Sequence, residues 1–115
     1  MSEAIDTREL PAVITGYLKA HQARDLAPAL ACYTENAVVT DEGRTHRGKE
    51  EIRAWLTHAA SEYTYTTTLV AAHRVDDEHY VAVHHLEGDF PGGVVDLRFQ
   101  FTLAGDRIAE LVIEP

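Results

Sequence analysis

The chain contains 115 residues, of which 45% are hydrophobic and 25% are charged, and this length and balance predict a single domain over residues 1–115. Ten Lys and Arg residues against nineteen Asp and Glu residues give a net charge of −9, which repels nucleic acids and anionic membranes. The apolar runs are far shorter than the roughly 20 residues that cross a bilayer. Because the acidic segment from Met1 to Leu10 does not resemble a signal peptide, we expect a cytoplasmic protein.

Two helices are predicted near the N-terminus. From Leu10 to His21, apolar side chains repeat at the spacing of one helix face, and Pro11 lies in a first turn, where proline is tolerated. A second helix is predicted after Asp25, whose carboxylate is expected to cap it. The buried side of this helix is predicted to contain Leu26, Ala29, Leu30 and Tyr33.

A short strand and a third helix follow. The segment Ala37–Asp41 is rich in β-branched residues and ends at the turn signal Glu42-Gly43. The third helix is predicted to start near Gly48, with acidic side chains in its first turn that favour a helix N-terminus. It is predicted to bury Ile52, Trp55, Leu56 and Ala59.

From Tyr63 onward the hydrophobic period changes from that of helices to that of strands. Short loops separate the predicted strands, so neighbours are expected to pair as antiparallel hairpins. The strands are Tyr63–Arg74, His79–Gly88, Val94–Leu103 and Arg107–Glu114. The third has the clearest alternation, with one side formed by Val95, Leu97, Phe99, Phe101 and Leu103.

This order of elements predicts an α+β fold, in which three N-terminal helices pack on one face of a curved antiparallel sheet. Residues 17–20, 24–26, 33–41 and 47–52 resemble the nuclear transport factor 2-like superfamily, which includes ketosteroid isomerases and SnoaL-like polyketide cyclases. The resemblance covers nearly the whole chain. It implies a cone-shaped, cystatin-like α+β roll with a deep pocket between sheet and helices, often in a homodimer.

Asp41 and Tyr17 are the predicted catalytic pair. Asp41 shares a strand face with Val39, which directs its carboxylate inward if Val39 belongs to the core. In the resemblance to ketosteroid isomerases, Asp41 matches the Asp that moves a proton and Tyr17 the Tyr that donates a hydrogen bond to the substrate oxygen. In an apolar cavity the pKa of Asp41 is expected to be raised. From the residues alone, Asp41 equally suits a turn and Tyr17 a plain core.

Leu97 is a departure from the isomerase pattern. When Phe99 and Phe101 are aligned with that pattern, Leu97 stands where those enzymes carry a protonated Asp that completes the oxyanion hole. Leucine cannot donate a hydrogen bond, and Asp96 points to the opposite face of the strand. The resemblance therefore supports the fold and the Asp41–Tyr17 pair more than it supports steroid isomerisation.

His84 and His85 point to opposite faces of a strand, so they cannot bind one ion from the same side. Alternation places His84 in the pocket, where it acts as a second acid or base, orients a ligand, or is a structural histidine. With Cys32 as the only cysteine, and no metal-ligand spacing among the histidines, we expect no metal and no cofactor. Exposed positions are predicted for most of the remaining histidines, His21, His46, His58, His73 and His79.

The expected ligand is a small apolar or ring-containing organic molecule. Its predicted contacts, Tyr33, Trp55, Leu97 and Phe99, also suit an ordinary core. The last strand has two equally apolar rows, which leaves open whether Glu110 or Glu114 faces the pocket.

Two functions are consistent with these features. The first is a SnoaL-like isomerase, cyclase or lyase that transfers a proton without a cofactor, using Asp41, Tyr17 and His84. The second is a noncatalytic ligand-binding or dimeric interaction domain of the same fold, in which Asp41 closes a turn.

A homodimer is predicted through the outer sheet face, where apolar and polar side chains are mixed. This face is expected to contain Val81, Val83, His85, Asp96, Arg98 and Gln100. The same alternation also suits the solvated face of a monomer.

Overall fold

The computed structural model describes residues 2–62 and 65–115, the side chains of residues 59–62 excepted. The helices are η1 (Thr7–Glu9, a 3₁₀ turn), α1 (Ala12–Gln22), α2 (Leu26–Ala31) and α3 (Gly48–Glu62). The strands are β1 (Glu3–Ile5), β2 (Tyr33–Asp41), β3 (Arg44–Arg47), β4 (Tyr65–Asp76), β5 (His79–Gly88), β6 (Val94–Ala104) and β7 (Arg107–Glu114). None of the helices in these ranges has both the length and the hydropathy of a membrane span.

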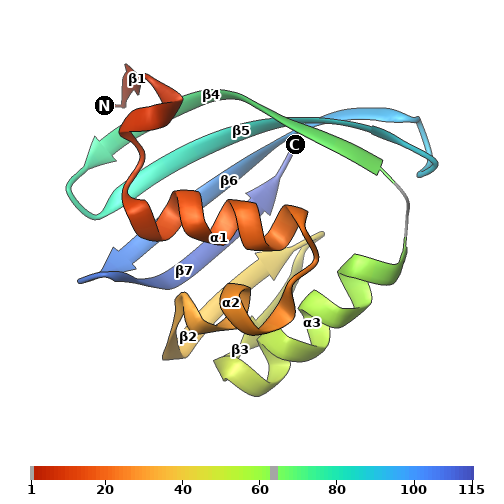
Figure 1. Cartoon of the computed structure of the whole chain (residues 1–115), viewed down its shortest axis with the longest axis horizontal. Helices are drawn as coiled ribbons and strands as arrows, with labels where there is room; N and C mark the ends of the chain where they lie inside the picture. The colour runs from red at the N-terminus through yellow and green to blue at the C-terminus, as the bar shows by residue number, and fades with distance from the viewer. Residues whose placement is uncertain (1, 63–64) are drawn as a thin grey trace.

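The described strands form one curved sheet in the order β1-β4-β5-β6-β7-β2-β3, and α1, α2 and α3 cover its concave face (Figure 1). This arrangement confirms the predicted α+β class and the helical layer. All neighbours pair antiparallel except β2 and β7, which run parallel. The prediction of a purely antiparallel sheet is therefore wrong at this pairing. Hairpin loops determine pairing only between consecutive strands, and β2 meets a strand from the far end of the chain.

Several boundaries differ from the predicted ones for local reasons. Tyr33 belongs to β2 and not to α2, because the helix ends after one and a half turns. The Asp25 side chain does not cap α2. The backbone carbonyl oxygen of Asp25 accepts a hydrogen bond from the backbone N–H of Ala29 at 3.3 Å. The short polar strands β1 and β3 were not predicted, because they lack an apolar period and gain their hydrogen bonds only by pairing with β4 and β2. The predicted Ala59 and Tyr63 positions lie outside the described side chains.

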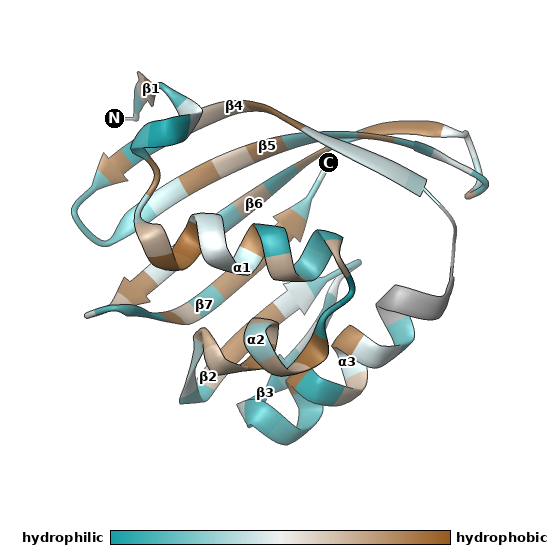
Figure 2. Cartoon of the chain, in the orientation of Figure 1, coloured by the Kyte–Doolittle hydropathy of each residue, from teal (hydrophilic) through white to brown (hydrophobic). Residues whose placement is uncertain are grey.

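The core lies between the helices and the concave face of the sheet. Figure 2 shows hydrophobic residues alternating with hydrophilic ones along the central strands. β5 and β7 have the predicted bounds, which confirms the period-two alternation as a guide. The largest fully buried side chains are Tyr17, Tyr33, Phe101, Ile14, Ile52, Ile108, Leu111 and Val39.

The burial of Val39 predicts a measurable asymmetry between two valines. Val39 on β2 is 0% exposed, whereas Val70 on β4 is 54% exposed. We expect Val39→Ala to lower the free energy of unfolding by about 2 kcal/mol, because it removes two buried methyl groups and leaves a cavity. Val70→Ala is the matched control and is expected to change stability by about 0.5 kcal/mol or less. Urea unfolding of both variants measures the difference; equal losses would place Val39 outside the core.

Candidate functional site

The deepest polar pair in the interior is formed by two tyrosines. The Tyr33 hydroxyl on β2 donates to the Tyr17 hydroxyl on α1 at 2.6 Å, and neither residue has exposed surface. Burial raises the pKa of both phenols above the ordinary tyrosine value, so both are uncharged at neutral pH. As the acceptor of this pair, Tyr17 keeps its own proton for a second hydrogen bond.

The Asp41 carboxylate lies at the end of the inner row of β2. Its Oδ2 accepts a hydrogen bond from Trp55 Nε1 at 3.1 Å, and Asp41 is half-buried. Its negative charge adds to burial in raising the pKa of Tyr17, which places the two predicted catalytic groups within electrostatic reach. Asp41 lines an open groove of about 680 Å³ beside Leu97 and Ile113. The side chain therefore lies on the inner side of β2, next to the groove.

Two histidines lie beside the Phe99 ring. The rings of His84 on β5 and His21 on α1 lie with their centroids 4.6 and 6.1 Å from the Phe99 centroid. His21 also lies 6.0 Å from the Trp55 ring, so its predicted exposure is wrong: α1 turns it onto the sheet. Burial lowers the pKa of each histidine to about 4. In His84, electrostatic repulsion from His21 also contributes to the lower pKa. Both imidazoles are therefore neutral at pH 7.

Two cavities border these histidines. A cavity of about 200 Å³ lies between the three helices and Tyr65, with Ala29 and Leu56 among its lining residues. It shares His21 and Tyr65 with a cavity of about 30 Å³ that is bordered by His84 and Phe99. The Arg24 guanidinium lies 5.9 Å from the Tyr65 ring centroid, at the side of the larger cavity.

The predicted site residues thus occupy three neighbouring places. Asp41, Trp55 and Leu97 are near the open groove, His84 and Phe99 border the small cavity, and Tyr17 and Tyr33 lie buried between helix and sheet. Sequence reasoning did not select Tyr65, His21 or Arg24 as site residues. His21 had a signal that favoured it, because it lies one helical turn after Tyr17 on the same face.

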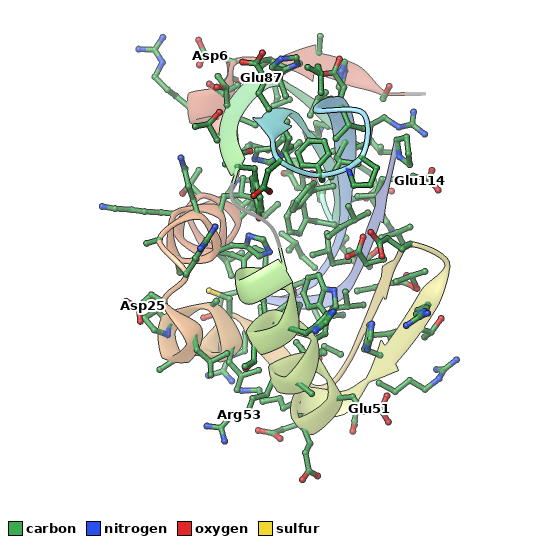
Figure 3. The ribbon with its side chains drawn as sticks, turned by 90° about the vertical axis from the view of Figure 1, so that its right-hand side faces the viewer. Asp6, Asp25, Glu51, Arg53, Glu87 and Glu114 are labelled. Carbon is green, nitrogen blue, oxygen red and sulfur yellow. The ribbon has the colours of Figure 1, made fainter. Side chains whose placement is uncertain are left out.

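Glu110 points away from the cavities, whereas Glu114 lines the open groove together with Asp41. The register shift between β6 and β7 makes Ala109 an extra residue, so that Ile108, Leu111 and Ile113 all share the buried face. Glu114 accepts from Arg98 and Gln100 on the outer face, and Figure 3 shows it at the edge of the molecule, like Asp25 and Glu51. The bulge explains why the alternation of this strand was ambiguous. Within the described residues no group of three or more His, Cys, Asp and Glu side chains is arranged to hold a metal.

Residues 14–111 match the model of the SnoaL-like domain family, which covers most of the chain and includes the Tyr17, Asp41, Trp55 and His84 positions. The chain belongs to the SnoaL-like domain family. This membership confirms the resemblance to nuclear transport factor 2-like proteins that the sequence motifs indicated. No curated protein sequence matches the chain.

Solved structures of SnoaL-like and related proteins share the fold. A polyketide cyclase-like protein from Sinorhizobium meliloti is 29% identical, with a TM-score of 0.88 over 96% of this chain and 100% of its own. A protein with a ketosteroid isomerase-like fold from Catenulispora acidiphila, in complex with trimethylamine, is 17% identical, with a TM-score of 0.79 over 91% and 85% of the two chains. A computationally designed 17-OHP binder is 17% identical, with a TM-score of 0.73 over 90% and 88%.

The two buried histidines predict a pH-dependent stability. Each has a pKa of about 4 in the folded protein against an ordinary value of 6.5, so the unfolded chain binds more protons between these values. The free energy of unfolding is therefore expected to fall as the pH decreases through this window, by about 2 kcal/mol per histidine at pH 5.

Urea unfolding at a series of pH values measures this dependence. His84→Phe is expected to remove about half of the loss between pH 7 and pH 5, and the double variant with His21→Phe nearly all of it. A wild-type slope that both single variants retain in full would contradict burial of neutral imidazoles.

Proposed function

We propose that this protein binds a small, largely apolar, ring-containing molecule between its helices and sheet and transfers a proton on it with Asp41 as the general base. The observation that carries the proposal is the Asp41 carboxylate, half-buried on the inner face, hydrogen-bonded to Trp55 Nε1, and beside apolar Leu97. The Trp55 hydrogen bond orients the carboxylate and leaves its other oxygen to accept a proton. The class of reaction is isomerisation, cyclisation or elimination without a cofactor.

Tyr17 is the proposed hydrogen-bond donor to the substrate oxygen. Its remaining proton and its proximity to the charge of Asp41 support this role. Because Tyr17 has no exposed surface, its contact with a substrate requires the aromatic side chains around it to move apart. Leu97 supplies apolar surface and no second donor, so the proposed oxyanion site has one tyrosine where ketosteroid isomerases use two groups.

A noncatalytic binding protein of the same family is the second candidate. The burial of Tyr17 against Tyr33 favours it, since a hydroxyl held inside the core is not presented to a cavity. The predominantly apolar walls of the cavity beside Tyr65 suit binding without chemistry.

Hydrogen–deuterium exchange at the carbon next to the carbonyl of a cyclic ketone distinguishes the two candidates. With 2-tetralone in D₂O, wild-type protein is expected to accelerate deuterium incorporation next to the carbonyl. Asp41→Asn is expected to reduce this acceleration about 100-fold or more, because it removes the base while leaving an oxygen that accepts from Trp55. NMR of the ketone measures the exchange.

Asp96→Asn is the matched control, because Asp96 lies on the outer sheet face and pairs with His85 at 2.6 Å. Binding is followed separately through the fluorescence of Trp55, the only tryptophan. Binding without accelerated exchange in the wild type would reject the base and favour the noncatalytic candidate. Tyr17→Phe tests the donor, with slower exchange expected.

We also propose that the outer sheet face forms a homodimer. Val81 and Val83 lie there half-buried, next to Gln100 and Arg98 on β6. The charged partners are paired within the chain, Asp96 with His85 and Arg98 with Glu114, which lowers the cost of covering them.

Light scattering at micromolar concentration tests the dimer. The chain mass is 12.8 kDa, so a mass of twice 12.8 kDa is expected for the wild type. Val83→Glu is expected to shift the mass to that of one chain by placing a charge in the interface, whereas Ala27→Glu, at an exposed position on α2 over the opposite face of the sheet, is the control. A wild-type mass of one chain would reject the dimer.

A further inference from the structure

His84 has an unsatisfied polar atom in the interior. The residue is only 6% exposed, and its Nδ1 has no hydrogen-bond partner among the described residues. Buried polar atoms are nearly always paired, because their hydrogen bonds with water have been lost. In a fold that binds small molecules, an unpaired buried atom such as His84 Nδ1 indicates that a bound ligand or water completes its hydrogen bond.

The space beside His84 has the size of one functional group. The adjoining cavity measures about 30 Å³, against about 200 Å³ for the cavity beside Tyr65. It is too small for a whole organic ligand. It shares His21 and Tyr65 with the cavity of about 200 Å³, so one end of a ligand in the larger space can reach it.

We propose that His84, together with His21, forms a polar subsite that takes one uncharged oxygen, a hydroxyl or a carbonyl, of a ring-containing ligand whose body occupies the larger cavity. This inference goes beyond the proposed function, because Asp41 lines the open groove whereas His21 and Tyr65 line the cavity that holds the body of this ligand.

The surroundings select an uncharged group. Leu18, Leu86 and Phe99 border the small cavity, and an anion there would lose its hydration without gaining a cation. The histidines are neutral because burial lowers their pKa, so neither supplies a positive charge at pH 7. A neutral imidazole exchanges its tautomer, so that Nδ1 either donates to a carbonyl or accepts from a hydroxyl.

Matched probes test the subsite. The probes are 2-tetralone and its 5-, 6-, 7- and 8-hydroxy derivatives, whose hydroxyl groups lie on the ring remote from the carbonyl. We expect one hydroxy isomer to bind wild-type protein about tenfold more tightly than 2-tetralone, as one added buried hydrogen bond provides. In His84→Phe this preference is expected to disappear, whereas His84→Asn, which keeps a polar side-chain nitrogen, is expected to retain part of it.

Nitrogen-15 NMR of the wild-type histidines gives a readout that does not depend on any variant folding. The His84 Nδ1 resonance is expected to shift with the preferred hydroxy isomer and not with 2-tetralone. His85→Phe is the matched control, because the neighbouring side chain lies on the outer face against Asp96. It is expected to leave the preference unchanged.

The outcomes separate this inference from the proposed function. Asp41→Asn is expected to lose proton exchange while retaining the preference for the hydroxy isomer. If no isomer binds more tightly than 2-tetralone and Nδ1 does not shift, a trapped water satisfies His84 and the subsite is rejected, whatever the exchange assay shows. Tighter binding of a 2-tetralone that carries a carboxylate in place of the remote hydroxyl than of every hydroxy isomer would also reject it, because the subsite would then select an anion.

Discussion

The parallel pairing of β2 with β7 is the contact on which the rest of the structure depends. It places Val39 opposite Leu111 and Asp41 opposite Ile113. β2 therefore continues the inner surface of the sheet formed by the C-terminal hairpins. α3 packs on β2, and Trp55 from this helix reaches the Asp41 carboxylate. Without this pairing the sheet would end at β7, and the acid would have neither its apolar neighbours nor its indole donor.

The interior that results has two polar ends separated by aromatic rings. Asp41 stands at one end and His84 at the other, with Trp55 and Phe99 between them. His21 contacts both of these rings, at 6.0 and 6.1 Å between centroids. A carboxylate and an imidazole offer different hydrogen-bonding chemistry, and this difference is the basis for proposing chemistry at one end and recognition at the other.

The outer face has the opposite character. Its charges neutralise one another over short distances, as in the His85–Asp96 pair and in the Arg98–Glu114 pair. The outer face is thereby distinct from the interior cavities, although Glu114 at its edge also lines the open groove. The bulge at Ala109 contributes to this separation, because it turns Glu110 outward while Leu111 stays in the core.

The sequence by itself determined the three α-helices, the long strands, and which side chains of β5 and β6 face inward. The bounds of β5, the opposite faces of His84 and His85, and the inward direction of Asp41 follow from the period-two alternation, which is a local property of the chain. Only the tertiary structure decided the partner of β2 and the outward direction of Glu110. Each of these depends on contacts between residues far apart in the chain, and a local pattern carries no information about them.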